Sequence, residues 1–254
     1  MMEVLGIILA SASLALFGVQ VRRLARVQRV KGLLAPIDTE VDIALHVANH
    51  AATSRAQALA PAHLLYGLVQ DETFVAALAR VGGDATALEG KLLDALETAP
   101  ATSTEPYAPE NAPFAIVAAR VYARHHDRAT QIADLWQAIA KSACADWIGP
   151  PPARLSFALI HGEAEPRAML PGETAVHVVL KNDDYTTFEF VTSILREVFE
   201  LTADAAQSVT LATHRDGHAI VGRFDTATAK RKVEEAWARA TTERFPLWVS
   251  VEVC

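Results

Sequence analysis

Residues 179–190 read VLKNDDYTTFEF and place three acceptor side chains, those of Asn182, Asp183 and Asp184, directly after an apolar run. The run before them (176–180, VHVVL) predicts a β-strand. Thr186 followed three residues later by Glu189 predicts a capping box, and therefore the start of a helix. An Asn-Asp-Asp cluster at such a place is typical of a turn with capping side chains. It also suits a ligand group with several hydrogen-bond donors, so these residues alone leave both interpretations open.

The segments after the cluster predict a small α/β domain over residues 175–254. The first predicted helix places Val191, Ile194, Leu195, Val198 and Phe199 on one face. The remaining predicted elements are a helix over 203–214 with a glycine stop at Gly217, a strand over 219–222, a helix over 226–243 and a strand over 247–253. The order β-α-α-β-α-β predicts helices packed on a small antiparallel sheet.

Residues 38–148 are alanine-rich with apolar positions three and four residues apart, which predicts an all-helical domain. Two halves, about 38–98 and 110–148, echo each other at an offset of 71 residues, and the proline-rich stretch between them predicts a loop. Residues 149–174 are predicted to be a linker, with a short strand over 154–160.

The N-terminal residues 1–21 contain an uncharged apolar run, and the first arginines follow it rather than precede it. This charge order differs from that of a cleaved signal peptide. It predicts a transmembrane anchor, with 22–37 as a basic juxtamembrane segment that meets membrane lipid. The expected location is the inner (cytoplasmic) membrane, single-pass, with the C-terminal domains in the cytoplasm. A buried, partner-binding or interfacial helix is the alternative.

Charge and cysteine content exclude several classes of function. Of the 23 basic and 30 acidic residues, five and one lie before residue 32, which leaves 18 basic and 29 acidic residues in the body of the chain. Such an acidic body disfavours nucleic-acid binding. Cys144 and Cys254 match no metal or redox spacing and suit a reducing compartment.

Other candidate sites are incomplete, and we expect no catalytic residue, no metal and no cofactor. His46 and His50 share a helical face, but the third ligand of a zinc site is missing, which disfavours a metal-dependent hydrolase. The sequence His125-His126-Asp127 is interpreted as a polar helix end. A phosphate-binding loop and a paired nucleophile and base are both absent from the sequence.

The acidic cluster and the segments C-terminal to it resemble the ClpS adaptor family. The matching residues are Asn182-Asp183-Asp184-Tyr185-Thr186, Glu189-Phe190-Val191, Leu211-Ala212-x-His214-x-x-Gly217-x-Ala219-Ile220-Val221-Gly222, Ala229-x-x-Lys232-Val233 and Pro246-Leu247. Adaptors of that family hold a free N-terminal residue that is large and apolar, and pass the protein to a Clp ATPase for degradation.

The resemblance assigns roles to individual residues. Asp183 and His214 are expected to contact the α-ammonium, while Asn182 orients the peptide backbone. The expected apolar pocket departs from the family at three positions, because Phe188 replaces a methionine and Thr210 and Thr213 replace apolar residues. The Clp ATPase contact is expected at Lys232, a basic position of the family, and at Ala227, which stands where an acidic residue is common. The full pocket set is Thr186, Phe188, Val191, Thr210, Thr213 and Leu247.

The stretch 60–96, APAHLLYGLVQDETFVAALARVGGDATALEGKLLDAL, resembles the first repeat of the N-terminal domain of Clp ATPases. The stretch 105–123, EPYAPENAPFAIVAARVYA, resembles the start of the second repeat. Ala60 and Ala62 stand where the family usually has threonine and glutamate, so a helix cap is lost. The predicted fold class is therefore an all-helical double repeat followed by a small β-α-α-β-α-β domain, with an N-terminal transmembrane helix.

The resemblance implies a membrane-anchored, non-enzymatic adaptor for a Clp AAA+ protease. Its expected substrates are proteins that begin with Leu, Phe, Tyr or Trp and have a free α-amino group. The alternative is a scaffold or regulator that reads no degron, in which the two modules bind each other or a Clp ATPase.

Overall fold

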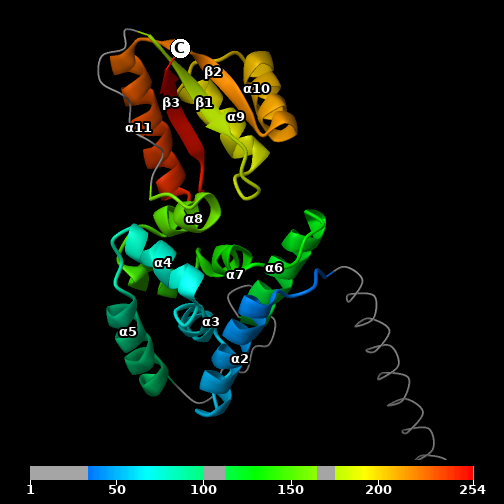
Figure 1. The fold of residues 1–254 in the computed structure, drawn as a ribbon, viewed down its shortest axis with the longest axis vertical. Helices are drawn as coiled ribbons and strands as arrows, with labels where there is room; N and C mark the ends of the chain where they lie inside the picture. The colour runs from blue at the N-terminus through cyan, green and yellow to red at the C-terminus, as the bar shows by residue number, and fades with distance from the viewer. Residues whose placement is uncertain (1–33, 100–111, 165–174, 254) are drawn as a thin grey trace, which may run out of the picture.

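The computed structural model describes residues 34–99, 112–164 and 175–253, which form two domains. Figure 1 shows the C-terminal α/β domain resting on one end of a larger helical domain. The helical domain (34–164) consists of α2 (Thr39–Thr53), α3 (Pro61–Leu68), α4 (Glu72–Arg80), α5 (Ala85–Thr98), α6 (Ala112–His125), α7 (Ile132–Ile139), the 3₁₀ helix η1 (Ala143–Ile148) and α8 (Pro152–His161). The α/β domain (175–253) consists of β1 (Val176–Lys181), α9 (Phe188–Glu197), α10 (Ala203–Asp216), β2 (His218–Phe224), α11 (Thr226–Thr242) and β3 (Trp248–Val253).

The internal repeat of the helical domain is visible in α3 and α7, which have equal lengths and lie 71 residues apart in the sequence. Both helices begin with the same hydrogen bond, although the residues differ. The side chain of the third helical residue accepts from the backbone N–H of the preceding cap residue, at 3.0 Å from Ala60 to His63 Nδ1 and at 2.8 Å from Gln131 to Asp134 Oδ2. His63 therefore replaces part of the cap that the sequence lacks at Ala60.

Helix α8 corrects two expectations from the sequence. Residues 154–160 were predicted to be a strand inside a linker, but 152–161 form a helix that begins with Pro152 and ends at Gly162, whose φ is 73°. Leu155 and Ala158 of this helix belong to the core of the helical domain. A proline in the first turn and a left-handed glycine after the last turn are both usual at helix ends.

The α/β domain has the predicted element order and an antiparallel three-stranded sheet with β1 in the centre, in the order β2-β1-β3. Alternate residues of β1, namely Val176, Val178 and Leu180, pack in one core with buried residues of α9, α10 and α11. Because successive side chains of a strand point to opposite faces, this alternation turns one face of the sheet toward the helices.

The two domains make several direct contacts, and Tyr185 is central to them. Its hydroxyl donates to Asp134 Oδ1 at 2.7 Å, and Arg128 Nη2 donates to the same oxygen at 2.9 Å. The Tyr185 ring stacks on that of Tyr122, with centroids 4.8 Å apart. At a second point, Arg244 Nη1 donates to the carbonyl of Ala140 at 2.6 Å. We call the Tyr185, Asp134, Arg128 and Tyr122 group the interdomain cluster.

The predicted membrane anchor is not supported. Residues 1–21, where the sequence predicts it, lie outside the described residues. Within 34–99, 112–164 and 175–253, the longest helix is α11, which has 17 residues and carries several charges. At ~1.5 Å per residue this helix is about 26 Å long, and a hydrocarbon core of ~30 Å requires about 20 mostly apolar residues. No described helix is both long and apolar enough to cross a membrane.

The fold class is corrected accordingly to a helical domain followed by a small three-stranded α/β domain, with no membrane-spanning helix among the described residues. The predicted single-pass location in the inner membrane and the predicted contact with membrane lipid relied on the same anchor. Both predictions are therefore not retained.

Candidate functional site

The acceptor cluster that opened the sequence forms the loop between β1 and α9. The strand ends where the backbone N–H of Asn182 donates to the carbonyl of Gly217 at 2.8 Å. Asp183 Oδ1 then accepts from the backbone N–H groups of Tyr185 (2.9 Å) and Thr186 (2.7 Å), and its Oδ2 accepts from the Thr186 hydroxyl (2.8 Å). Three hydrogen bonds therefore hold the carboxylate in one orientation, and Oδ2 keeps capacity to accept from a ligand.

The start of α9 differs by one residue from the predicted capping box. The N-cap is Thr187, whose hydroxyl oxygen accepts from the N–H of Phe190 at 3.3 Å. Thr186 does not cap the helix because its hydroxyl already donates to Asp183. The expected pairing of Thr186 with Glu189 is therefore wrong, and the threonine next in sequence takes the capping role.

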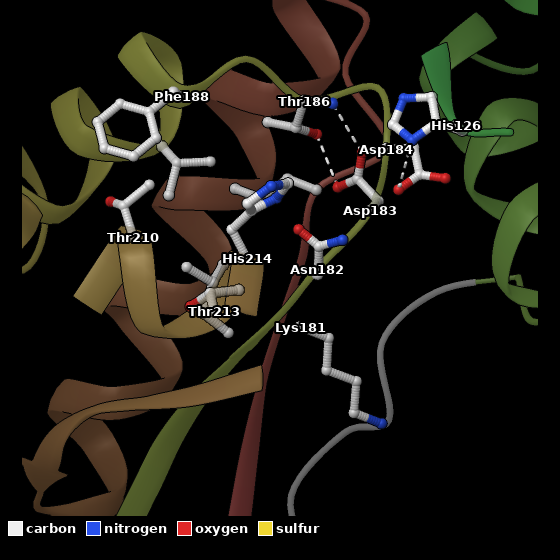
Figure 2. A pocket seen from close by; sticks show the side chains of 13 residues that line it. His126, Lys181, Asn182, Asp183, Asp184, Thr186, Phe188, Thr210, Thr213 and His214 are labelled. Atoms are coloured by element: carbon white, nitrogen blue, oxygen red, sulfur yellow. Dashed lines mark hydrogen bonds and ion pairs between the residues drawn. The ribbon is translucent and has the colours of Figure 1, made fainter. Parts of the chain in front are cut away.

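A hollow of about 260 Å³ lies beside this loop. Figure 2 shows that Asn182 and Asp183 on the loop and His214 on α10 point toward one another there. Lys181 and Asp184 point away from this meeting point. The residues that line the hollow are His126, Leu180, Lys181, Asn182, Asp183, Asp184, Thr186, Phe188, Val191, Thr210, Thr213, His214 and Leu247.

The electrostatic character of the meeting point depends mainly on Asp183. Burial raises the pKa of this carboxyl, and the hydrogen bonds from Thr186 and Tyr185 partly offset that rise because they favour the charged form. A desolvated carboxylate of this kind gains most from a cationic hydrogen-bond donor. Asn182 and the imidazole of His214 add further acceptor capacity at the same point.

The rest of the hollow is largely apolar. Val191 and Leu247 are buried in its wall, and Phe188 lies at the mouth with 40% of its surface exposed. Thr210 and Thr213 are also buried, but their hydroxyls donate to backbone carbonyls of their own helix, those of Ala206 (2.8 Å) and Val209 (2.9 Å). Neither hydroxyl depends on a ligand for a partner, so an apolar side chain beside them leaves no donor unpaired.

The two residues expected to contact a Clp ATPase lie outside the hollow. Lys232 is buried, and its ammonium donates to the carbonyl of Val198 at 2.6 Å and to Glu200 Oε1 at 2.9 Å. Ala227 is exposed in the first turn of α11. Figure 1 places this start of α11 at the end of the α/β domain that lies away from the helical domain.

Four residues of the hollow were not among the predicted site residues: Leu180, Lys181, Asp184 and His126. The first three adjoin Asn182 and Asp183 in the sequence, whereas His126 belongs to the other domain. His126 directly follows α6 in the helical domain, and its Nδ1 lies 3.6 Å from Asp184 Oδ1. The sequence interpretation of His126 as a polar helix end is incomplete, because no local pattern connects two segments that are more than 50 residues apart. The other histidines considered, His46 and His50, lie on α2 and do not line this hollow. The described residues contain no cluster of three or more potential metal ligands.

Comparison with known proteins identifies both domains. The family model described as ATP-dependent Clp protease adaptor protein ClpS matches residues 172–250, and the Clp repeat (R) N-terminal domain matches residues 37–140. The ATP-dependent Clp protease adapter protein ClpS of Nitratidesulfovibrio vulgaris is 49% identical over 75 residues, which cover 30% of this chain and 72% of that protein. The chain belongs to the ClpS adaptor family.

Further members of that family match the α/β domain, which we now call the ClpS domain. The ClpS adapter of Vibrio cholerae is 36% identical over 107 residues, covering 42% of this chain and 93% of that protein. Among solved structures, that of Agrobacterium tumefaciens ClpS2 bound to L-phenylalaninamide has 37% sequence identity. The match spans 31% of this chain and 95% of that one, with a TM-score of 0.30. The predicted arrangement, a ClpS domain preceded by a Clp N-terminal repeat domain, is confirmed.

Proposed function

We propose that this protein is a non-enzymatic adaptor that binds the free N-terminal residue of other proteins and delivers them to a Clp AAA+ protease. The observation that carries the proposal is the convergence of Asn182, Asp183 and His214 at one end of an apolar hollow. Membership of the ClpS family supports the adaptor role and the Clp protease as partner.

The ligand group that suits this meeting point is a free α-ammonium. It carries one positive charge and three donors, and the Asp183 carboxylate, the Asn182 amide and the His214 imidazole offer three acceptors. An acetylated N-terminus has no charge and a single donor. It would leave the desolvated carboxylate without a cation, and this penalty lets the site reject modified protein ends.

The first side chain of the substrate enters the apolar part of the hollow. A volume of about 260 Å³ is smaller than the ~300–1,000 Å³ of typical drug-sized pockets, and it suits one large residue. The intrahelical hydrogen bonds of Thr210 and Thr213 keep that part suitable for Leu, Phe, Tyr or Trp. Phe188 lies at the mouth, where its ring would cover the bound side chain.

We place the contact with the Clp ATPase at the start of α11, around Ala227. This end of the ClpS domain lies away from the helical domain, so the ClpS domain can contact the Clp ATPase and the helical domain at the same time. Lys232 acts there mainly through its hydrogen bonds to Val198 and Glu200, which attach α11 to the end of α9.

The test is a fluorescence-anisotropy titration of the full chain with labelled peptides that begin with Leu, Phe, Tyr or Trp. Each peptide is compared with its N-acetylated form and with a peptide that begins with Asp. We expect the free-amine peptides to bind at least tenfold more tightly than the acetylated ones. Equal affinity for free and acetylated peptides would show that the site does not read an ammonium.

The second candidate is a scaffold in which the two domains bind each other and no degron is read. The interdomain cluster around Tyr185 favours it, because this cluster already joins the domains. Separately expressed domains that associate while neither binds any of the peptides would support the scaffold. Peptide binding by the full chain favours the adaptor.

A further inference from the structure

Tyr185 belongs both to the loop beside the hollow and to the contact between the domains. Its backbone N–H donates to Asp183 Oδ1 at 2.9 Å, so its main chain helps to hold the proposed ammonium acceptor. Its hydroxyl donates to Asp134 Oδ1 of α7, and its ring stacks on Tyr122 of α6 with an interplanar angle of 12°. One residue therefore connects the helical domain to the carboxylate of the site.

Asp134 is a fixed acceptor for the Tyr185 hydroxyl. Its carboxylate is buried in the helical domain. Arg128 donates to both of its oxygens, and the backbone N–H of Gln131 donates to Oδ2 at 2.8 Å. Burial and the neighbouring Asp134 carboxylate raise the pKa of Tyr185, so its hydroxyl keeps the proton that it donates at neutral pH. The hydrogen bond between the domains thus joins a protonated donor to an acceptor that its own domain holds in place.

The loop over 182–187, between β1 and α9, has no regular secondary structure of its own. Ordering such a loop costs conformational entropy. A contact that orders the loop before a ligand arrives removes part of this cost from the binding step. The contact between Tyr185 and the helical domain is of this kind, because fixing Tyr185 also fixes its N–H, which donates to Asp183.

We propose that Tyr185 is a positioning residue, through which docking of the helical domain strengthens the binding of a substrate's N-terminal ammonium by Asp183. This inference rests on the proposed binding of N-terminal residues by the hollow. Coupling between two binding equilibria is reciprocal, so a bound N-terminal residue also strengthens the docking of the two domains. The helical domain is then a part of the receptor, and its release from the loop weakens substrate binding.

The test compares Tyr185→Phe with Tyr122→Phe in the full chain. The two rings stack on each other, and each change removes one hydroxyl while keeping the ring. The Tyr185 hydroxyl donates to Asp134, whereas the Tyr122 hydroxyl is buried without a hydrogen-bond partner among the described residues. In anisotropy titrations with a peptide that begins with phenylalanine, Tyr185→Phe should bind about two- to tenfold more weakly than the wild type, the effect of one hydrogen bond. Tyr122→Phe should bind like the wild type.

Two readouts separate a positioning role from a general loss of stability. The first is the ratio of affinities for the free-amine peptide and its N-acetylated form. This ratio should fall in Tyr185→Phe, because Asp183 acts on the ammonium, whereas a general loss of folded protein would leave it unchanged. The second is hydrogen exchange in α7, whose residues do not line the hollow. Saturating peptide should slow exchange of the α7 amides in the wild type, and do so less in Tyr185→Phe.

The possible results distinguish this inference from the proposed function. If the wild type binds the free-amine peptide and a folded Tyr185→Phe protein binds it equally well, the coupling is wrong and the adaptor proposal stands. An equal loss of affinity in Tyr122→Phe, or an unchanged ratio of free to acetylated binding in Tyr185→Phe, also overturns the coupling. If the wild type binds no free-amine peptide, both proposals fail.

Discussion

Replacing Asp183 by asparagine tests whether the carboxylate at the centre of the site binds a cation. The change removes the negative charge but keeps the shape of the loop. The remaining carbonyl oxygen still accepts from the N–H groups of Tyr185 and Thr186, and the new NH₂ group faces the Thr186 hydroxyl oxygen, which can accept from it. The substitution therefore separates the charge of Asp183 from its structural role.

The expected loss of affinity is set by the hydrogen bond between the ammonium and the carboxylate. A hydrogen bond to a charged group contributes about 1.5–3 kcal/mol. Since each 1.4 kcal/mol corresponds to about a tenfold change in Kd, a free-amine peptide should bind roughly ten- to one-hundred-fold more weakly. The folded state should lose little stability, because burial already disfavours the charged form of Asp183.

The assay is fluorescence anisotropy with a peptide that begins with phenylalanine, together with a thermal melt of each protein. Asp225→Asn is the matched control, since Asp225 Oδ1 accepts from the N–H of Thr228 at the start of α11, outside the hollow. That control should keep the peptide affinity of the wild type. We expect Asp183→Asn to melt within about 2–4 °C of the wild type, which corresponds to about 1 kcal/mol for a chain of this size.

A folded Asp183→Asn protein that binds the peptide within twofold of the wild type would refute the reasoning. Such a result would mean that the carboxylate only shapes the turn. Equal losses in Asp183→Asn and Asp225→Asn would also count against a specific role, because they would indicate a general effect of lost helix-cap or loop charge.

Four further predictions concern pH, packing and the interdomain cluster. Peptide binding should fall at both ends of the pH range. At low pH, protonation of Asp183 removes its charge, and this begins at a higher pH than for an ordinary aspartate because burial raises the pKa of Asp183. At high pH the peptide amine, with a pKa of about 7.7–8.0, loses its proton. An affinity that stays constant from about pH 4 to 9 would contradict this prediction. Burial lowers the pKa of His63, so the unfolded state binds more protons and the free energy of unfolding should fall as the pH drops below about 6.5. Urea melts at about pH 7.5 and 5.5 should show this loss. His63→Asn keeps an acceptor near the position of Nδ1 and should make the difference between the two melts smaller. Gly67→Ala should destabilise the helical domain by about 1–3 kcal/mol in a urea melt, since the new Cβ would lie 2.1 Å from the carbonyl oxygen of Ala44, whereas Gly90→Ala, with nothing within 4 Å, should not. Tyr185→Phe removes the hydroxyl that donates to Asp134 of α7, so the free energy of unfolding in a urea melt should fall by about 0.5–1.5 kcal/mol, the contribution of one hydrogen bond.

The sequence was sufficient to predict the element order of the ClpS domain, the double repeat of the helical domain and the candidate acceptors Asn182, Asp183 and His214. The element order follows from local patterns: an apolar run at β1, helical spacing in α9, and turn and cap residues between them. The roles of the three acceptors and the identity of the repeat came from the resemblance to known families. The 71-residue offset could also have predicted α8, because 156–161 lie 71 residues after the first part of α5. The GPPP sequence at 149–152 favoured a linker instead.

The details on which specificity depends could be read only from the packed structure. Whether the Thr210 hydroxyl faces a ligand or its own helix depends on a rotamer, and whether Lys232 is a surface charge depends on the packing of α11 against the end of α9. The place of His126 in the wall of the hollow depends on the contact between two domains. The interdomain contacts join residues that are distant in the chain, and local sequence patterns do not predict which distant residues are in contact.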